Sequence, residues 1–557
     1  HTTMKQLLTS LTALLLVSGG CTPEEEPEAT IRIDLARRGA DIPTSMYGIF
    51  FEEINHAGDG GLYAELIQNR GFEDSSVPEG YTVKGDRIFP PADRTNHLTG
   101  ARPHPDLSFR WNPDPIPAWR FEQLEGSGAS AELTREYPLN EASPTALKVT
   151  LPEKGRIALS NCGFWGMNIE KGKGYYLRMN TSNGNRFEGR AILKLVAEDG
   201  TELCNRPLAI DPDRTWCEYT GQLTATGSDP HARFVIELEG TGTLLLDYVS
   251  LFPETFRNRI NGLRNDIAQT LEALHPAFVR WPGGCIVEGI DLSNRIEWKK
   301  TIGDPKNRPG IYDTWGYRAT MGFGYHEFLQ FCEDIGAAGM FVCNAGIGCQ
   351  GRVGDACREE DLDAFIQDAL DAIDYALGDG TTEWSRKRVE NGHPEPFTLD
   401  YIEVGNENHS AMYAKYYNRF YKRIREAYPD ITIITCLPMS EQLGWIDGYD
   451  MNDPHFYNFP SWFYSNTDYF DRFPREEGHK TYVGEYACNM GVGAGNMEGA
   501  LSEGAFIMGM ERNSDLVTMC SYAPLMENTK CRMGVNLILV RNDDVIGRSS
   551  YWVERMF

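Results

Sequence analysis

The sequence lacks the usual signatures of metal, nucleotide and nucleic-acid proteins. Its 13 cysteines include no CxxC pair and no zinc-type spacing, and their odd number argues against a full disulfide framework. No GxGxxG or P-loop motif opens a predicted helix. Basic residues are few, 53 against 80 acidic ones, so the net charge is −27. This charge repels nucleic acid and anionic membranes, whereas a neutral substrate such as a polysaccharide remains compatible with it.

Long apolar runs are also scarce. The run Leu7–Val17 is too short for a permanent membrane helix. It follows Met4-Lys5 and precedes Ser18-Gly19-Gly20-Cys21, a pattern that resembles a bacterial lipoprotein signal with lipid attachment at Cys21. We expect residues 1–28 to be a signal and tether, and membrane contact only through the lipid. Plain secretion or a periplasmic form is the alternative to attachment at the cell envelope or surface, because Ser18 stands where Leu is commonest.

The chain has 557 residues, a length from which two to four domains are expected. Its pattern of predicted strands and helices changes along the sequence and divides it into several regions. Residues 75–255 contain short strand-like runs separated by Gly, Asp, Asn and Pro, which predicts an inserted β-sandwich. Residues 29–74 would supply an N-terminal strand, Ile31–Leu35, a strand at Tyr47–Phe51 and a short helix at Leu62–Gln68.

Residues 256–525 alternate helices with short apolar strands, a pattern typical of a parallel sheet in an α/β protein. With Tyr47–Phe51 counted first, eight strands predict a (β/α)₈ TIM barrel, and a doubly wound open sheet is the rival. The elements expected after the insert are Ile260–Leu274, Ala277–Trp281, Gly324–Gly336, Met340–Asn344, Asp361–Leu377, Leu399–Val404, Met412–Tyr428, Thr432–Leu437, Asp453–Tyr457, Tyr482–Glu485, Ala500–Arg512 and Leu516–Tyr522.

Two carboxylates end the fourth and seventh predicted strands, at Glu407 and Glu485. Catalytic residues of such barrels lie at the carboxyl ends of the strands. A retaining glycosidase needs two carboxyl groups about 5 Å apart, one as nucleophile and one as general acid/base. Asn406, just before Glu407, is suited to bind the sugar hydroxyl next to the anomeric carbon. The plain alternative is that either glutamate is an ordinary surface carboxylate.

Five segments in sequence order resemble glycoside hydrolase family 51, the α-L-arabinofuranosidases of clan A. They are Tyr47–Leu66, Arg280–Gly284, Tyr401–Asn408, Asp453–Tyr457 and Val483–Ala487. The resemblance covers about 29–74 and 256–557, and the insert resembles the carbohydrate-binding-like β-sandwich of one branch of the family. It implies a retaining exo-enzyme that releases arabinofuranosyl residues from arabinoxylan, arabinan or arabino-oligosaccharides without a cofactor or metal. It is also compatible with a homo-oligomer.

The resemblance assigns roles to individual residues. Glu407 would be the acid/base and Glu485 the nucleophile. The substrate-binding set would be Glu52, Asn406, His455, Tyr457, Arg280, Asn344 and Cys285. Glu53 competes with Glu52 by strand register, and a structural role is the alternative for His455. Family members continue with a C-terminal β-sandwich, which we expect to be largely missing here, with only its start at 526–557.

Two other functions stay open. One is a clan A endo-glycosidase that cuts xylan or glucan, which a cleft instead of a pocket would favour. The other is a surface glycan-binding lipoprotein with an inactive barrel, whose 75–255 module would bind sugar without turnover.

Overall fold

The computed structural model describes residues 34, 36, 39–211, 215–475, 478–531 and 533–557. The expected signal and tether, its Cys21 and the expected strand Ile31–Leu35, apart from Asp34, lie outside the described residues. The chain forms two compact units, His1–Ala40 and Asp41–Phe557. All features described below belong to the second unit.

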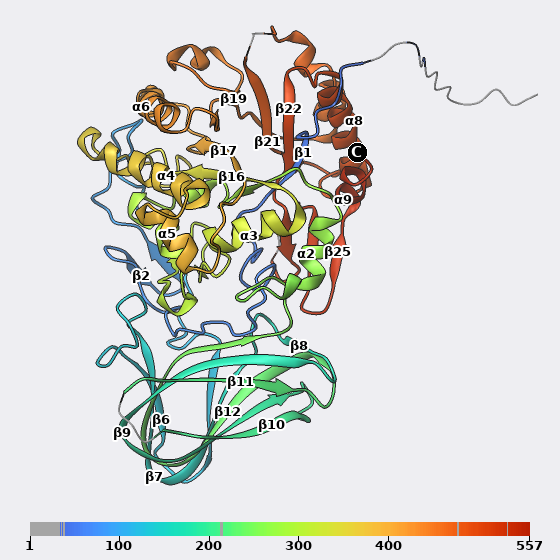
Figure 1. Ribbon diagram of the computed structural model, residues 1–557. Helices are drawn as coiled ribbons and strands as arrows, with labels where there is room; N and C mark the ends of the chain where they lie inside the picture. Colours follow the sequence, from blue (N-terminus) through green and yellow to red (C-terminus); the bar gives the residue numbers. More distant parts are fainter. Residues whose placement is uncertain (1–33, 35, 37–38, 212–214, 476–477, 532) are drawn as a thin grey trace, which may run out of the picture. The chain divides into compact units, whose positions relative to one another are not determined.

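Eight parallel strand positions close into a barrel (Figure 1). Each strand pairs with the next, and the last pairs with the first, so the open-sheet alternative is wrong. The sixth position is shared by two short strands, β19 and β20, which both pair with β21. In barrel order the strands are β1 (Tyr47–Phe50), β13 (Phe278–Trp281), β16 (Ala338–Cys343), β17 (Leu399–Val404), β18 (Thr432–Thr435), β19 (Met451–Asn452) with β20 (His455–Asn458), β21 (Lys480–Cys488) and β22 (Val517–Tyr522).

Helices separate most of these strands along the chain. They are α2 (Asn265–Glu272), α3 (Tyr325–Ile335), α4 (Leu362–Leu377), α5 (Glu383–Glu390), α6 (Ala411–Ala427), α7 (Pro460–Ser465) and α8 (Met497–Arg512). Helix α3 shows why local signals predicted these elements well. The Glu327 carboxylate accepts a hydrogen bond from the Gly324 backbone at its start, and Gly336 at its end adopts φ 72°, a left-handed conformation that favours glycine.

One predicted helix is wrong and another begins later than expected, for a shared reason. Leu62–Gln68 forms turns and extended chain, and α2 begins five residues later than Ile260. The Arg264 amide donates to the Leu62 carbonyl, and the Leu66 amide donates to Leu251 in the insert. These long-range pairings use the backbone groups that a helix would need, so tertiary structure overrides the local helical pattern.

The insert is an antiparallel sheet built on three long strands, β7 (Ala146–Asn161), β9 (Gly174–Val196) and β12 (Asp229–Phe252). Strand β12 is a single long strand where short strand-like runs were expected, and its register shifts between Gly240 and Gly242. Apolar side chains of both halves enter one core, so the sheet folds over itself into two layers (Figure 1). The flanking strands are β5 (Trp119–Glu125), β6 (Ser130–Thr134), β8 (Met167–Ile169), β10 (Glu202–Ala209) and β11 (Cys217–Thr224).

After the barrel, three short strands form a separate sheet and a short helix follows. These are β23 (Met526–Asn528), β24 (Ile538–Val540), β25 (Val545–Gly547) and α9 (Ser549–Glu554). Other small pieces are β2 (Thr82–Lys84), β3 (Arg87–Phe89), β4 (Phe109–Arg110), β14 (Ile311–Tyr312) and β15 (Arg318–Ala319). Within the described ranges, none of the helices has the length and apolar character of a membrane span.

A buried carboxyl links α8 to α9 and makes stability depend on pH. Glu503 accepts hydrogen bonds from the Ser550 hydroxyl (2.6 Å) and the Cys488 amide (2.7 Å). Burial outweighs these contacts and raises the pKa of Glu503 from 4.5 to about 7. The folded protein therefore keeps a proton that the unfolded chain releases between these pH values, and this contribution to stability is lost as the pH rises to about 7.

We expect Glu503→Gln, which mimics the protonated acid, to remove this pH dependence. The wild-type free energy of unfolding should lose about 3 kcal/mol relative to the variant between about pH 4.5 and pH 8. Denaturant titrations of both proteins across this range provide the measurement. Parallel curves for the two proteins would contradict the assignment.

Candidate active site

A cavity of about 290 Å³ opens at the carboxyl ends of the barrel strands. This volume is at the low end for small-molecule pockets and suits one sugar unit better than a chain. The cavity is lined by Phe50, Glu52, Ile54, Gly284, Cys285, Trp315, Glu407, Tyr457, Glu485, Asn489, Pro524, Met533 and Val535.

Glu485 projects from β21, and both of its oxygens are held by hydrogen bonds. Arg280 Nη1 donates to Oε1 at 3.1 Å, and the Tyr457 hydroxyl donates to Oε2 at 2.5 Å. The Glu485 side chain is 9% exposed. Two donors fix the orientation of this enclosed carboxylate, as a nucleophile requires.

Glu407 follows β17 and faces Glu485 across the pocket. Its φ of 48° lies in the left-handed region, which residues other than glycine rarely adopt and which is often found at functional sites. A Glu407 oxygen, a Glu485 oxygen and a ring nitrogen of His455 all lie within 4.8 Å of one another. This spacing matches the carboxylate pair of retaining glycosidases and is too short for an inverting pair.

His455, on β20, joins the two sides of the site. Its Nδ1 lies 2.8 Å from Glu407 Oε1 and its Nε2 lies 2.9 Å from Asp453 Oδ2. Burial lowers the pKa of His455, but the nearby Glu485 and Asp453 carboxylates outweigh burial and raise it well above its usual range. A protonated ring would donate one N–H group to Glu407 and the other to Asp453.

The same cation controls Glu407. Burial raises the pKa of Glu407, but the hydrogen bond and positive charge of His455 outweigh burial and lower this pKa to about 2. These opposite pKa shifts favour the proton of this pair on His455. Moving it across the 2.8 Å hydrogen bond would convert Glu407 into the neutral acid.

Glu52 is the member of the Glu52-Glu53 pair that lines the pocket. Its Oε1 accepts hydrogen bonds from the Ile286 amide (3.0 Å) and the Trp315 indole (3.2 Å). Burial and the charge of Glu485 raise the pKa of Glu52 to about 8. Glu53 instead contacts Tyr317 and the Asp59 amide on the other side of the chain, as the alternation of side chains after a strand requires.

Arg280 lies beneath the pocket floor and is 0% exposed. In addition to Glu485, its guanidinium donates to Glu403 (2.7 Å) and to Asn406 Oδ1 (3.1 Å). Arg280 thus positions Asn406 and Glu485 together. Asn406 Nδ2 makes no hydrogen bond of ordinary geometry in the described part of the chain, but the Asn406 amide lies near the buried Glu288 carboxyl and lowers its pKa.

Cys285 and Asn344, both expected to bind substrate, have different positions. Cys285 lines the pocket, and Asn344 is not among the residues that line it. Its amide donates to the carbonyls of Val287 and Ile347 (3.1 and 3.3 Å) and so holds two loops together behind the wall.

Several contributors to the site had not been singled out from the sequence. Asp453 and Glu403 lie inside the recognised motifs, where their charge next to a strand end was a usable signal. Trp315, Asn489 and Met533 reach the pocket from loops that have no periodic pattern. In the insert, Trp119 is buried at 4% exposure, whereas Trp165 is 41% exposed.

We expect Tyr457→Phe to lower kcat/KM for an aryl arabinofuranoside about 10- to 100-fold. The variant loses the hydroxyl that binds Glu485, and a hydrogen bond to a charged group contributes about 1.5–3 kcal/mol. Tyr464→Phe, at an exposed tyrosine of α7, is the matched control and should be unaffected. Equal activity of the two variants would exclude a role for the Tyr457 hydroxyl.

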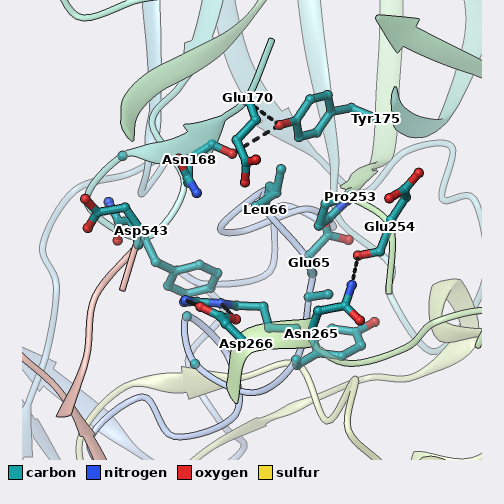
Figure 2. Close-up of a pocket in the computed structure, with 18 of the residues that line it drawn as sticks. Glu65, Leu66, Asn168, Glu170, Tyr175, Pro253, Glu254, Asn265, Asp266 and Asp543 are labelled. Carbon is teal, nitrogen blue, oxygen red and sulfur yellow. Dashed lines mark hydrogen bonds and ion pairs between the residues drawn. The ribbon is translucent and has the colours of Figure 1, made fainter. Parts of the chain in front are cut away.

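A larger cavity, of about 340 Å³, lies between the insert and the barrel (Figure 2). Its acidic side chains are largely engaged with basic neighbours. Glu65 pairs with Arg70 at 3.0 Å and accepts a hydrogen bond from Ser250. Glu254 and Asp266 form ion pairs with Lys173 and Arg264. This arrangement supplies no facing pair of free carboxylates, so the smaller pocket is the better candidate for catalysis.

Comparisons with known proteins point to one family. The family model "Alpha-L-arabinofuranosidase 1 domain" matches residues 270–475, and "Alpha-L-arabinofuranosidase C-terminal domain" matches 484–557. Alpha-L-arabinofuranosidase 1 of Arabidopsis thaliana is 35% identical over 99% of this chain and 79% of that protein. The extracellular exo-alpha-L-arabinofuranosidase of Streptomyces chartreusis is 34% identical over 99% of this chain and 64% of that protein.

The fold leads to the same family. The arabinose-bound structure of the α-L-arabinofuranosidase MgGH51 has a TM-score of 0.79 and 31% sequence identity, covering 93% of this chain and 80% of that one. Its likeness extends over the barrel that carries Glu407 and Glu485. The chain belongs to the α-L-arabinofuranosidases of glycoside hydrolase family 51.

Proposed function

We propose that this protein releases terminal α-L-arabinofuranosyl residues by double displacement, with Glu485 as nucleophile and Glu407 as general acid/base. The proposal depends on one observation. An oxygen of Glu407 and an oxygen of Glu485 lie within 4.8 Å of each other in a pocket that suits one sugar unit. Their exposures support the division of roles. Glu407 has a 33% exposed side chain and can meet a leaving group or water, whereas Glu485 is enclosed.

In the first step, a Glu485 oxygen attacks the anomeric carbon, and the bond to the leaving oxygen breaks. Glu407 gives its proton to that oxygen, so the leaving group departs as a neutral alcohol. In the second step, Glu407 takes a proton from water, whose oxygen attacks the anomeric carbon and releases Glu485 as a carboxylate. Two inversions give arabinose with its original configuration.

His455 would supply the proton to Glu407. The negative charge of Glu485 is the strongest of the electrostatic interactions that raise the pKa of His455. As Glu485 bonds to the sugar, it loses this charge, and the pKa of His455 falls. The proton then favours Glu407, from which it passes to the leaving oxygen. The loss of charge on the nucleophile would thus trigger the transfer of the proton to Glu407.

The remaining pocket residues would bind the sugar. Asn406, whose side-chain oxygen is held by Arg280, would bind the hydroxyl next to the anomeric carbon. Glu52 and Tyr457 would bind other hydroxyls, and Cys285 would pack against the ring. Arg280 and Asn344 would act as positioning residues, because their contacts described above are with protein groups.

The natural substrates would be arabinose-bearing plant polysaccharides or oligosaccharides, and the surroundings extracellular. The word "extracellular" in the name of the Streptomyces relative supports export, as does the apolar run before Cys21. Lipid attachment at Cys21 is the more specific form of this proposal. We further propose that residues 75–255 form an inserted carbohydrate-binding-like module, supported by its own apolar core.

Release of free arabinose from an aryl α-L-arabinofuranoside tests the activity. We expect a monosaccharide to be the first product from arabino-oligosaccharides as well. Internal cuts in xylan or glucan, without release of arabinose, would instead support the endo-glycosidase. Binding of sugar without turnover would support the inactive glycan-binding protein.

A further inference from the structure

Three side chains at one wall of the pocket form a group of metal-ligand type. They are Cys285, Glu288 and Cys349, and one potential ligand atom of each lies within 4.8 Å of the others. Cys285 and Glu288 belong to the turn that follows β13, and Cys349 lies on the loop after β16. The group is therefore assembled from two separate segments of the chain.

The two cysteines are free thiols in contact with each other. Their mutual hydrogen bond raises the pKa of Cys285 and lowers that of Cys349. Cys349 is 2% exposed, whereas Cys285 is partly exposed and lines the catalytic pocket. The pair thus reaches from the protein interior to the substrate site.

Glu288 provides an independent reason to expect a ligand. It is 1% exposed, and its Oε1 accepts a hydrogen bond from Asn408 Nδ2. Its Oε2 makes no hydrogen bond of ordinary geometry among the residues that the structure describes, although the Asn406 amide lies near enough to lower the pKa of this carboxyl. An unsatisfied buried carboxylate oxygen is costly, so it requires either a proton or a cation.

The backbone holds the group in place. The Asn344 side chain donates to Val287 O, beside Glu288, and to Ile347 O, two residues before Cys349. One amide therefore joins the two segments that carry the candidate ligands. A site fixed in advance loses less conformational entropy when it binds a ligand.

We propose that Cys285, Cys349 and Glu288 form an inhibitory site for a thiophilic divalent cation such as Zn²⁺. Two thiolates and a carboxylate suit Zn²⁺, whereas Mg²⁺ and Ca²⁺ prefer oxygen ligands alone. On binding, each cysteine thiol gives its proton to solvent and its sulfur bonds to the metal, without a change in oxidation state. A fourth position remains for water.

Inhibition follows from the place of this site. Cys285 shares the pocket wall with Glu52 and Glu407. The Glu288 carboxyl is close enough to Glu407 for the charge of each to affect the other. A cation bound there would favour the Glu407 carboxylate over its acid form and so oppose protonation of the leaving group.

Zinc retention by the full chain tests the site directly. The protein, kept reduced with a non-chelating phosphine, is exposed to Zn²⁺ and passed through gel filtration, and bound metal is measured. We expect one Zn²⁺ per wild-type chain and at least a tenfold weaker affinity in Cys349→Ser. Cys162→Ser, at the exposed cysteine, is the matched control and should bind like wild type. Because this readout needs no turnover, it stands apart from the proposed function.

Zn²⁺ should also inhibit wild-type arabinose release, a chelator should restore it, and Mg²⁺ should have no effect. Each variant is compared with its own metal-free rate, and Cys349→Ser should require at least tenfold more Zn²⁺ for half inhibition. If Cys349→Ser does not fold, loss of zinc retention in Cys285→Ser serves as the test. Absence of bound zinc in wild type, or undiminished binding in folded Cys349→Ser or Cys285→Ser, would overturn the proposal.

Discussion

Glu485→Ala is expected to lower kcat/KM for an aryl α-L-arabinofuranoside by about 10⁴-fold or more. The variant keeps Glu407 and the sugar-binding groups but lacks the atom that bonds to the anomeric carbon. The Glu485 carboxylate also pairs with Arg280 and accepts a hydrogen bond from the Tyr457 hydroxyl, and the variant loses both contacts. Glu390→Ala, at an exposed glutamate ending α5, is the control and should retain full activity.

Azide gives this variant a more specific test. In the space left by the side chain, azide should attack the anomeric carbon once, with departure of the leaving group. One displacement inverts the configuration, so the product should be the β-L-arabinofuranosyl azide. The product can be identified by NMR. An α-azide would show that a covalent enzyme intermediate still forms, and Glu485 would then not be the nucleophile.

Glu407→Ala should give a loss that depends on the leaving group. For arabino-oligosaccharides, whose leaving alcohol needs a proton, we expect kcat/KM to fall by about 10²–10⁴-fold. For a dinitrophenyl arabinofuranoside the first step should remain fast, because that phenolate leaves without protonation. The dependence of rate on leaving-group pKa, measured over a series of aryl glycosides, should be steep in the variant and shallow in the wild type.

The stereochemistry of azide rescue separates the two glutamates. In Glu407→Ala, azide should attack the sugar bonded to Glu485 and yield the α-azide, after two inversions. A uniform loss across all leaving groups would mean that Glu407 supports the fold or the binding of sugar and is not the acid. The two rescue experiments therefore have opposite expected products and control each other.

Much of the barrel was predictable because its signals are local. The β17 strand has the predicted bounds Leu399–Val404, and α3 lies between its two capping glycines. The two proposed catalytic glutamates were predictable for the same reason, since Glu407 comes shortly after an apolar strand and Glu485 lies within one. The failures at Leu62–Gln68 and before α2 arose where backbone groups pair with distant segments, and no local pattern records such a pairing.

The site was predictable to a similar limit. Most residues of the site on strands or close after them had been named, apart from Glu403 and Asp453, whereas loop residues such as Trp315 and Met533 were missed. The cysteine pattern shows the same limit, because a spacing rule considers only cysteines that are close in sequence. Cys285 and Cys349 become neighbours only when β13 and β16 pair in the barrel.

Arg280 has a consequence for how such an enzyme can be altered. One buried guanidinium on β13 contacts Glu403 on β17 and Glu485 on β21, and it lies over the Phe50 ring of β1. The group that orients the nucleophile therefore also joins strands on different sides of the barrel. Changes to this centre would alter folding and turnover together. New substrate preferences are more accessible through the loops around the pocket, such as the one bearing Trp315, where sequence can vary without loss of this internal charge balance.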